Sequence, residues 1–169
     1  VNVVRQISLN GILAVGVTYV LLTGGVDLSL GSLVALTGVA AACFAHPGDY
    51  PLIVPVLIGV LTGLACGAVN GLVITHGRVA PFIVTLGMMT AARGLALVIS
   101  GGKPVSNLSR PFLTIGGDVL GFPIPILILL VVALVSWVFL ANTRLGRYVY
   151  AVGGNEKAAV LSGIRVDRM

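Results

Sequence analysis

Charged side chains are scarce in this 169-residue chain, at 9% of the composition, against about 25% in ordinary soluble domains. Hydrophobic residues make up 57%, and the mean hydropathy is +1.12. So few charges cannot give a soluble globule its polar coat. The apolar runs are continuous over roughly 20 residues, whereas the strands of a membrane barrel alternate over about 10. The composition therefore predicts an all-α fold, a polytopic transmembrane helical bundle.

The sequence also lacks the motifs for disulfide frameworks, metal sites, nucleotide binding and hydrolytic catalysis. The two cysteines, Cys43 and Cys66, both lie in apolar runs and predict neither a disulfide framework nor a metal site. The Gly-Lys pair at Gly102 has Leu97 where a nucleotide-binding loop needs its first glycine, and Pro104 follows the lysine. Gly-x-Gly, Gly-x-Ser-x-Gly and His-Glu-x-x-His are absent from the sequence. We expect no catalytic residue, no metal and no cofactor, and we expect that the chain is not an enzyme.

Five apolar stretches dominate what is present, and a helix of about 20 residues crosses the roughly 30 Å hydrocarbon core. They cover residues 7–23, 30–45, 51–75, 79–99 and 122–141. The third and fifth are long enough to cross alone. The first two are short and are separated by a break around Asp27. The chain lacks an initiator Met and a signal peptide, so we expect a piece of a longer chain. Five crossings from an external start predict a further helix before Val1.

Charge predicts the orientation of these segments. Residues 142–169 carry five basic and two acidic side chains, a net charge of +3, whereas the loop 100–121 carries +1. The positive-inside rule places the tail in the cytoplasm and this loop outside. The break at Asp27 is then expected on the cytoplasmic side and the start of the chain outside. Arg5 is the one basic residue whose predicted external position disagrees with the positive-inside rule. Basic residues at segment ends favour anionic lipid as a partner over nucleic acid.

Glycine recurs every fourth residue in the third stretch, at Gly59, Gly63, Gly67 and Gly71. This spacing keeps the glycines on one helix face, where another helix backbone can approach closely. We interpret this glycine ridge as internal helix packing, with a subunit interface or a pathway lining as alternatives. Asn70 lies beside the ridge and is a candidate for hydrogen bonding between helices or for substrate contact.

Two charged residues, Asp27 in the break and Arg93 in the fourth stretch, need partners or water, because an ionised side chain in hydrocarbon costs several kcal/mol. Asp27 or Ser29 is predicted to cap the helix that follows the break, or to act as a hinge. The alternative is a direct role in gating or transport. Arg93 is interpreted as an anchor that reaches the external interface, with a place on a pathway as the alternative. We do not expect it to pair with Asp27.

The polar tail contains a short helical pattern. Asn155 can cap it, Glu156 suits its first turn and Gly163 can close it. Residues 158–161 give it a small apolar surface. This segment is either a helix on the solvated or lipid surface or a docking site for a cytoplasmic partner.

Four blocks of sequence carry a resemblance to a known protein family. They are residues 24–32 (GGVDLSLGS), 77–87 with Ala92-Arg93-Gly94 (GRVAPFIVTLG), 101–105 (GGKPV) and 143–164 (TRLGRYVYAVGGNEKAAVLSGI). Together they resemble the permease subunits of bacterial ABC importers for ribose, xylose and related simple sugars. The resemblance covers essentially the whole chain, and the last block is the most specific.

The resemblance implies a transmembrane permease subunit that passes ribose or a related monosaccharide across the inner membrane as a multi-pass protein. It implies a permease dimer, a cytoplasmic ABC ATPase and a periplasmic sugar-binding protein. Residues 1–169 would be one partial transmembrane permease domain, with 142–169 as its cytoplasmic coupling loop. The coupling residues would be Asn155, Glu156, Ala158, Ala159 and Gly163. The tail departs from the family motif because Lys157 precedes the alanines and Gly163 falls seven rather than six residues after the glutamate.

Two other classes of function stay open at this point. Asp27 and the broken helix could form the ion site of a secondary transporter driven by protons or Na⁺, because discontinuous helices build such sites. Transport without any ATPase would favour this alternative. A membrane scaffold that moves no substrate is the third possibility.

Overall fold

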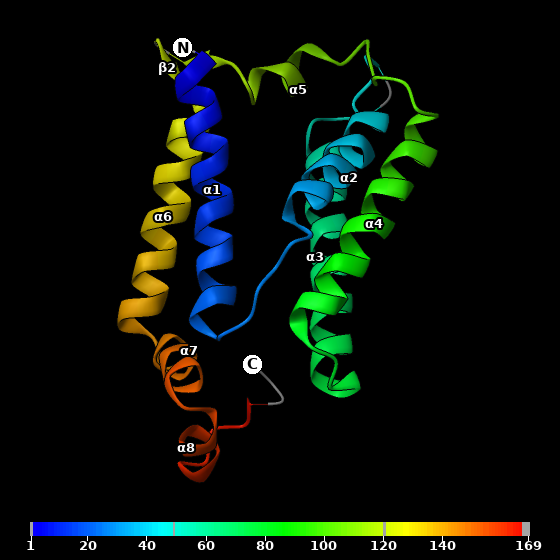
Figure 1. Ribbon diagram of the computed structural model, residues 1–169. Helices are drawn as coiled ribbons and strands as arrows, with labels where there is room; N and C mark the ends of the chain where they lie inside the picture. The colour runs from blue at the N-terminus through cyan, green and yellow to red at the C-terminus, as the bar shows by residue number, and fades with distance from the viewer. Residues whose placement is uncertain (1, 49, 120, 167–169) are drawn as a thin grey trace. The chain divides into compact units, whose positions relative to one another are not determined.

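The fold is built mainly of helices in the computed structural model, which describes residues 2–48, 50–119 and 121–166 (Figure 1). The prediction of an all-α chain is confirmed, and the described strands are a single antiparallel pair of two residues each. The elements in chain order are α1 (Asn2–Leu22), α2 (Leu30–Cys43), α3 (Ile53–Gly77), α4 (Pro81–Ser100), α5 (Arg110–Thr114), β1 (Asp118–Val119), β2 (Phe122–Pro123), α6 (Ile124–Asn142), α7 (Arg144–Gly154) and α8 (Glu156–Leu161).

Four of the described helices are long and apolar enough to cross a membrane: α1, α3, α4 and α6. Helix α2 is apolar but has 14 residues, which extend about 21 Å and fall short of the hydrocarbon core. The expectation that the first stretch is short was wrong. Helix α1 begins at Asn2 rather than Ile7 because it continues through Arg5 and Gln6, polar residues that a reading of hydropathy leaves out.

The chain forms two compact units. One contains residues 1–26 and 117–169, and the other contains residues 27–116. The first unit therefore joins the two ends of the chain, α1 with α6, α7 and α8. The second is a continuous stretch that holds α2, α3, α4 and α5.

Helices α1 and α6 of the first unit lie side by side and parallel (Figure 1). At their starts, Arg5 forms an ion pair with Asp118 at 3.0 Å. Near their ends, the rings of Tyr19 and Phe139 have centroids 5.9 Å apart. Arg5, the basic residue that contradicted the predicted orientation, thus has a carboxylate partner from the loop predicted to lie on the same side.

A tight turn connects α6 to α7. The Thr143 hydroxyl donates to the Phe139 carbonyl at 2.6 Å and accepts from the Gly146 N–H at 3.0 Å, so one side chain ends α6 and begins α7. Gly146 lies directly against the last carbonyls of α6, and Gly153 lies against the Leu22 carbonyl at the end of α1. A side chain at either glycine would collide with main-chain atoms, so α7 is held against the ends of both α1 and α6.

Helix α2 of the second unit packs against both α3 and α4. Leu36 of α2 and Ala92 and Ala96 of α4 form its buried core. Gly59 and Gly63 of α3 face Thr37 and Ala41 of α2, and a Cβ at Gly59 would lie 3.4 Å from the Ala41 Cβ. Small residues on facing helices therefore bring the two backbones close together, as is common in membrane bundles.

The loop before α5 is tied to the end of α2. The Ser109 N–H donates to the Ala45 carbonyl at 2.7 Å, and His46 Nδ1 lies 3.1 Å from the Asn107 carbonyl oxygen. Asn107 has a left-handed backbone, with φ of 57°, which asparagine tolerates better than most residues.

We expect Gly153→Ala to destabilise the protein, because the added methyl group collides with a main-chain carbonyl that cannot move aside. Overpacking of this kind costs about 1–3 kcal/mol. Thermal unfolding of the purified protein in detergent measures the change. Gly154→Ala is the matched control, since a Cβ there meets nothing within 4 Å. Equal midpoints for the two variants would contradict the close approach of α7 to α1.

A second pair of variants tests the glycine ridge. Gly59→Leu should lower the unfolding midpoint, because the leucine has to separate α2 from α3, again at a cost of about 1–3 kcal/mol. Gly67→Leu should leave the midpoint nearly unchanged, since a Cβ at Gly67 meets nothing within 4 Å. Equal destabilisation by both leucines would show that the whole ridge is packed.

Candidate functional site

The break between α1 and α2 begins with a tight turn at the end of α1. Gly24, with φ of +80°, is in the left-handed region that glycine adopts without strain. The Gly24 and Gly25 N–H groups donate to the Leu21 and Val20 carbonyls, both at 3.0 Å. These bonds satisfy the last carbonyls of α1 in the manner of a helix C-cap. The chain then continues in extended form to Ser29.

Asp27 organises the entry to α2. Its Oδ1 atom accepts hydrogen bonds from the Ser29 N–H at 2.7 Å and from the Ser29 hydroxyl at 2.6 Å. The prediction was that Asp27 or Ser29 caps α2. Ser29 stands at the N-cap position, but its side chain makes no capping hydrogen bond to the helix. The carboxylate instead fixes the residue before the helix, and the Ser29 hydroxyl points toward Asp27.

Asn70 completes this group from α3. Its side-chain Nδ2 donates to the Ser29 Oγ at 3.4 Å, and both residues are buried. Asn70 Oδ1 is buried and has no hydrogen-bond partner, a state shared in the described part of the chain only with Arg5 Nε. An orphaned buried acceptor costs about 1–3 kcal/mol. We call Asp27, Ser29 and Asn70 the Asp27 cluster.

The Asp27 cluster lies within the span of α3 rather than at its end. Helix α3 covers Ile53–Gly77, so seven residues, or about 10 Å at 1.5 Å per residue, separate Asn70 from Gly77. Main chain that leaves a helix at such depth is tolerated only where protein or water covers it. Burial of Ser29 and Asn70 provides part of this cover.

The two halves of the glycine ridge differ in their packing, and the change falls beside the Asp27 cluster. Gly59 and Gly63 pack against α2, whereas a Cβ at Gly67 or Gly71 would meet nothing within 4 Å. The reason is the short length of α2, whose first turn begins beside Asn70, so that α2 covers only the Gly59 half of the ridge. Gly67 and Gly71 lie on the open half, next to the Asp27 cluster.

Arg93 lies outside this cluster. It is exposed on α4, while its neighbours Ala92 and Ala96 are buried in the core. In the described ranges the ion pair is that of Arg5 with Asp118. An exposed guanidinium on a membrane-spanning helix requires water or a partner outside the second unit.

The tail carries a second candidate site, on α8. The predicted cap is confirmed, because Asn155 Oδ1 accepts from the Ala158 N–H at 3.0 Å. Gly163 closes the helix with φ of +83° and donates its N–H to the Val160 carbonyl at 3.0 Å. Ala159 is buried, whereas Leu161 is 89% exposed and Val160 is 54% exposed. A short helix with fixed ends thus presents two apolar side chains outward.

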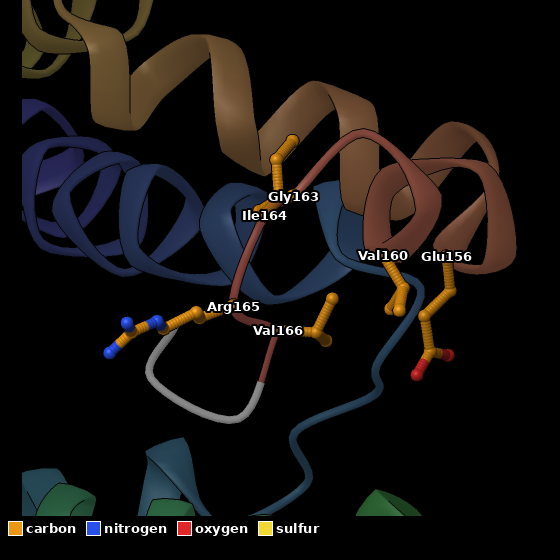
Figure 2. A pocket seen from close by; sticks show the side chains of 6 residues that line it. All are labelled: Glu156, Val160, Gly163, Ile164, Arg165 and Val166. Carbon is orange, nitrogen blue, oxygen red and sulfur yellow. The ribbon is translucent and has the colours of Figure 1, made fainter.

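An open hollow of about 410 Å³ lies beside α8 (Figure 2). Figure 2 shows Glu156 and Val160 extending from the same side of α8, one turn apart, with the segment 163–166 opposite and Arg165 pointing away. The hollow has an acidic group and an apolar group on its helical wall.

Sequence reasoning missed α7, the helix between α6 and α8. Two signals were available: Thr143 is a preferred N-cap residue, and Gly146 and Gly153 are spaced for close contacts on one helix. The apolar stretches alone could not show it, because α7 mixes arginine, tyrosine and glycine with its apolar residues. The meeting of Asn70 with Ser29 was also missed, since 41 residues separate them.

The known proteins that this chain resembles are permease proteins of sugar transport systems. The chain is 43% identical over 173 residues to the ribose import permease protein RbsC of Haemophilus influenzae, covering 99% of this chain and 53% of that protein. It is 45% identical over 173 residues to the RbsC protein of Escherichia coli K12, covering 99% and 54%. The D-allose transport system permease protein AlsC of Escherichia coli K12 is 38% identical over 162 residues, covering 95% and 50%.

The chain thus spans about half the length of the curated relatives it matches. No solved structure matches it. The model of the family described as "Branched-chain amino acid transport system / permease component" matches residues 1–169. That match, together with relatives at 43% and 45% identity along nearly the whole chain, shows that the chain belongs to this family of transport permease components.

Proposed function

We propose that this chain is part of the transmembrane permease subunit of an ATP-driven importer in the bacterial inner membrane, where it passes ribose or a related monosaccharide. The observation that carries the proposal is the identity of 43% to 45% with ribose import permease proteins along 99% of the chain. The four helices long enough to cross a membrane support a multi-pass location. A dimeric permease and a periplasmic sugar-binding protein complete the proposed importer.

The energy source belongs to a separate cytoplasmic ABC ATPase. The sequence has no nucleotide-binding loop, because Leu97 and Pro104 interrupt the pattern around Gly102-Lys103. We therefore assign nucleotide binding to a separate partner subunit. Residues 142–169 are the proposed coupling loop to that partner, within one partial transmembrane domain that covers 1–169.

Helix α8 is the part of this loop best suited to contact the ATPase. Asn155 and Gly163 fix its two ends, and Ala159 anchors it by burial. Glu156 and Ala158 are exposed in its first turn. A partner that covers the exposed Leu161 and Val160 would gain about 25 cal/mol of binding free energy for each Å² of apolar surface removed from water.

The first unit offers a mechanical route from α8 into the membrane. Helix α7 is attached to the end of α6 through Thr143 and lies against the end of α1 through Gly153. A displacement of α8 and α7 would therefore move the ends of both spans together. Helix α1 ends at Leu22, only five residues before Asp27. ATP could shift the permease in this way only if the ATPase contacts α8 differently in its two states.

The translocation and gating candidates are Asp27, Ser29, Asn70 and Arg93. Asp27, Ser29 and Asn70 form one polar cluster within the depth of α3. Arg93 faces outward from the second unit. The exposed apolar residues of α3, α4 and α6 are proposed to face lipid, the second permease subunit or other parts of the importer.

We test the coupling role with single cysteines on α8, in a protein whose Cys43 and Cys66 have been replaced. Leu161→Cys and Val160→Cys should crosslink to the ATPase, with a yield that changes at least several-fold when ATP is added. Ala159→Cys is the matched control, because this side chain is 4% exposed and should not react. Crosslinks at none of the exposed positions, with the ATPase folded and bound, would contradict the coupling role.

Ribose uptake into vesicles tests the energy source. The complete importer should accumulate ribose only when ATP, the ATPase and the binding protein are all present. Uptake by the permease alone in response to a Na⁺ or proton gradient would instead show an ion-coupled transporter, with Asp27 as its natural ion ligand. No uptake with all partners supplied would show that the chain does not transport ribose.

A further inference from the structure

The Asp27 cluster has two acceptor oxygens without a donor from the described residues. Asn70 Oδ1 is buried and unpartnered, in a residue that is 6% exposed. Asp27 uses Oδ1 for both of its described hydrogen bonds, and the carboxylate is only half-buried. Ser29 Oγ already donates to Asp27 and accepts from Asn70 Nδ2. A ligand that fits here therefore has to bring at least two hydrogen-bond donors.

Open helix surface lies directly beside these acceptors. Gly67 and Gly71 are three residues before and one residue after Asn70, and a Cβ at either would meet nothing within 4 Å. Their lack of side chains leaves a smooth patch of α3 next to the amide. A flat ring could lie along this patch, and its polar edge reaches the covered Asn70 Oδ1 once the cluster opens to it.

We propose that the Asp27 cluster and the Gly67–Gly71 patch form a contact site for adjacent hydroxyl groups of a monosaccharide inside the permease. Asn70 Oδ1 accepts one hydroxyl proton, and the free oxygen of the Asp27 carboxylate accepts the neighbouring one. The ring lies against the glycine patch. This inference rests on the proposed function, because it names the side chains that the transported sugar touches.

The number and kind of the acceptors favour a diol over a cation. Hard cations take six or more oxygen ligands, as Ca²⁺ and Mg²⁺ do, whereas the cluster offers two free acceptors and one hydroxyl already in use. Residues of the α3 interior add no ligands, since their carbonyl groups are bonded within the helix. Two free acceptors on one cluster match a ligand that carries two hydroxyl donors.

Protection of a cysteine from labelling tests the site. Gly67→Cys is placed in the full-length permease without Cys43 and Cys66, reconstituted in vesicles, and reacted with a small water-soluble thiol reagent. D-ribose at tens of millimolar should slow the labelling of this cysteine several-fold. An equal concentration of 2,3-dideoxyribose, which lacks the adjacent hydroxyl pair, should not. Gly94→Cys on α4 is the control position, with open surroundings, and its labelling should not respond to ribose.

Two variants assign the effect to the amide. Asn70→Leu removes both polar atoms at similar size, and Asn70→Ala removes them without filling the site, so either should abolish protection by ribose. Labelling rates measured without sugar, and the rate at Gly94→Cys, show whether each variant keeps its fold. Protection that survives in a folded variant would overturn the assignment to Asn70.

Other results of the labelling experiment would overturn the proposed sugar-contact site. Failure of the thiol reagent to reach Gly67→Cys would show that this face is closed to water, which overturns the proposal. Labelling slowed by Na⁺ rather than by ribose would show a cation site and overturn it. Equal labelling with and without ribose, while the intact importer still takes up ribose, would overturn this site alone. Absent ribose uptake by the intact importer would instead count against the proposed function.

Discussion

Main-chain groups inside a membrane must find hydrogen-bond partners within the protein, and the break after α1 is where this chain meets that constraint. Two glycines turn back to bond the last carbonyls of α1, and the Asp27 carboxylate takes up the N–H and the hydroxyl of Ser29. Asn70 then reaches Ser29 from α3. The break thus brings its own polar groups and the amide of a neighbouring helix together in one cluster.

The short length of α2 has consequences for the rest of the second unit. Because α2 starts at Leu30, it packs against only one half of the glycine ridge. The packed half holds α2 and α3 at close range through Gly59 and Gly63. The other half, with the same spacing of glycines, lies beside the polar cluster and is open. One periodic pattern in the sequence thus has two structural roles, and the end of the neighbouring helix separates them.

The sequence predicts the helices of this chain better than it predicts their contacts. Apolar stretches of about 20 residues locate the spans because helix length in a membrane is set by the thickness of the hydrocarbon. The cap at Asn155 and the closing glycine at Gly163 could be predicted because capping is local. The start of α1 could not, because Arg5 and Gln6 interrupt the apolar pattern and Arg5 has its carboxylate partner 113 residues away. The division of the ridge could not be predicted either, since Gly59 and Gly67 have equivalent positions in the repeat.

Gly146 and Gly153 let the tail pack directly against the ends of two helices, and this contact could not be predicted from the sequence. Both positions lie against main-chain carbonyls, one at the end of α6 and one at the end of α1. Contacts between backbones have no flexible side chain to absorb a displacement, so the tail and the two helix ends are expected to move as one body. Helix α1 ends five residues before Asp27, at a break where the backbone leaves helical structure and is held by the hydrogen bonds of Gly24, Gly25 and Asp27. If the proposed ATPase contact displaces α8, the end of α1 moves with it, five residues before Asp27 in the sequence, and this is the connection that the proposed coupling requires.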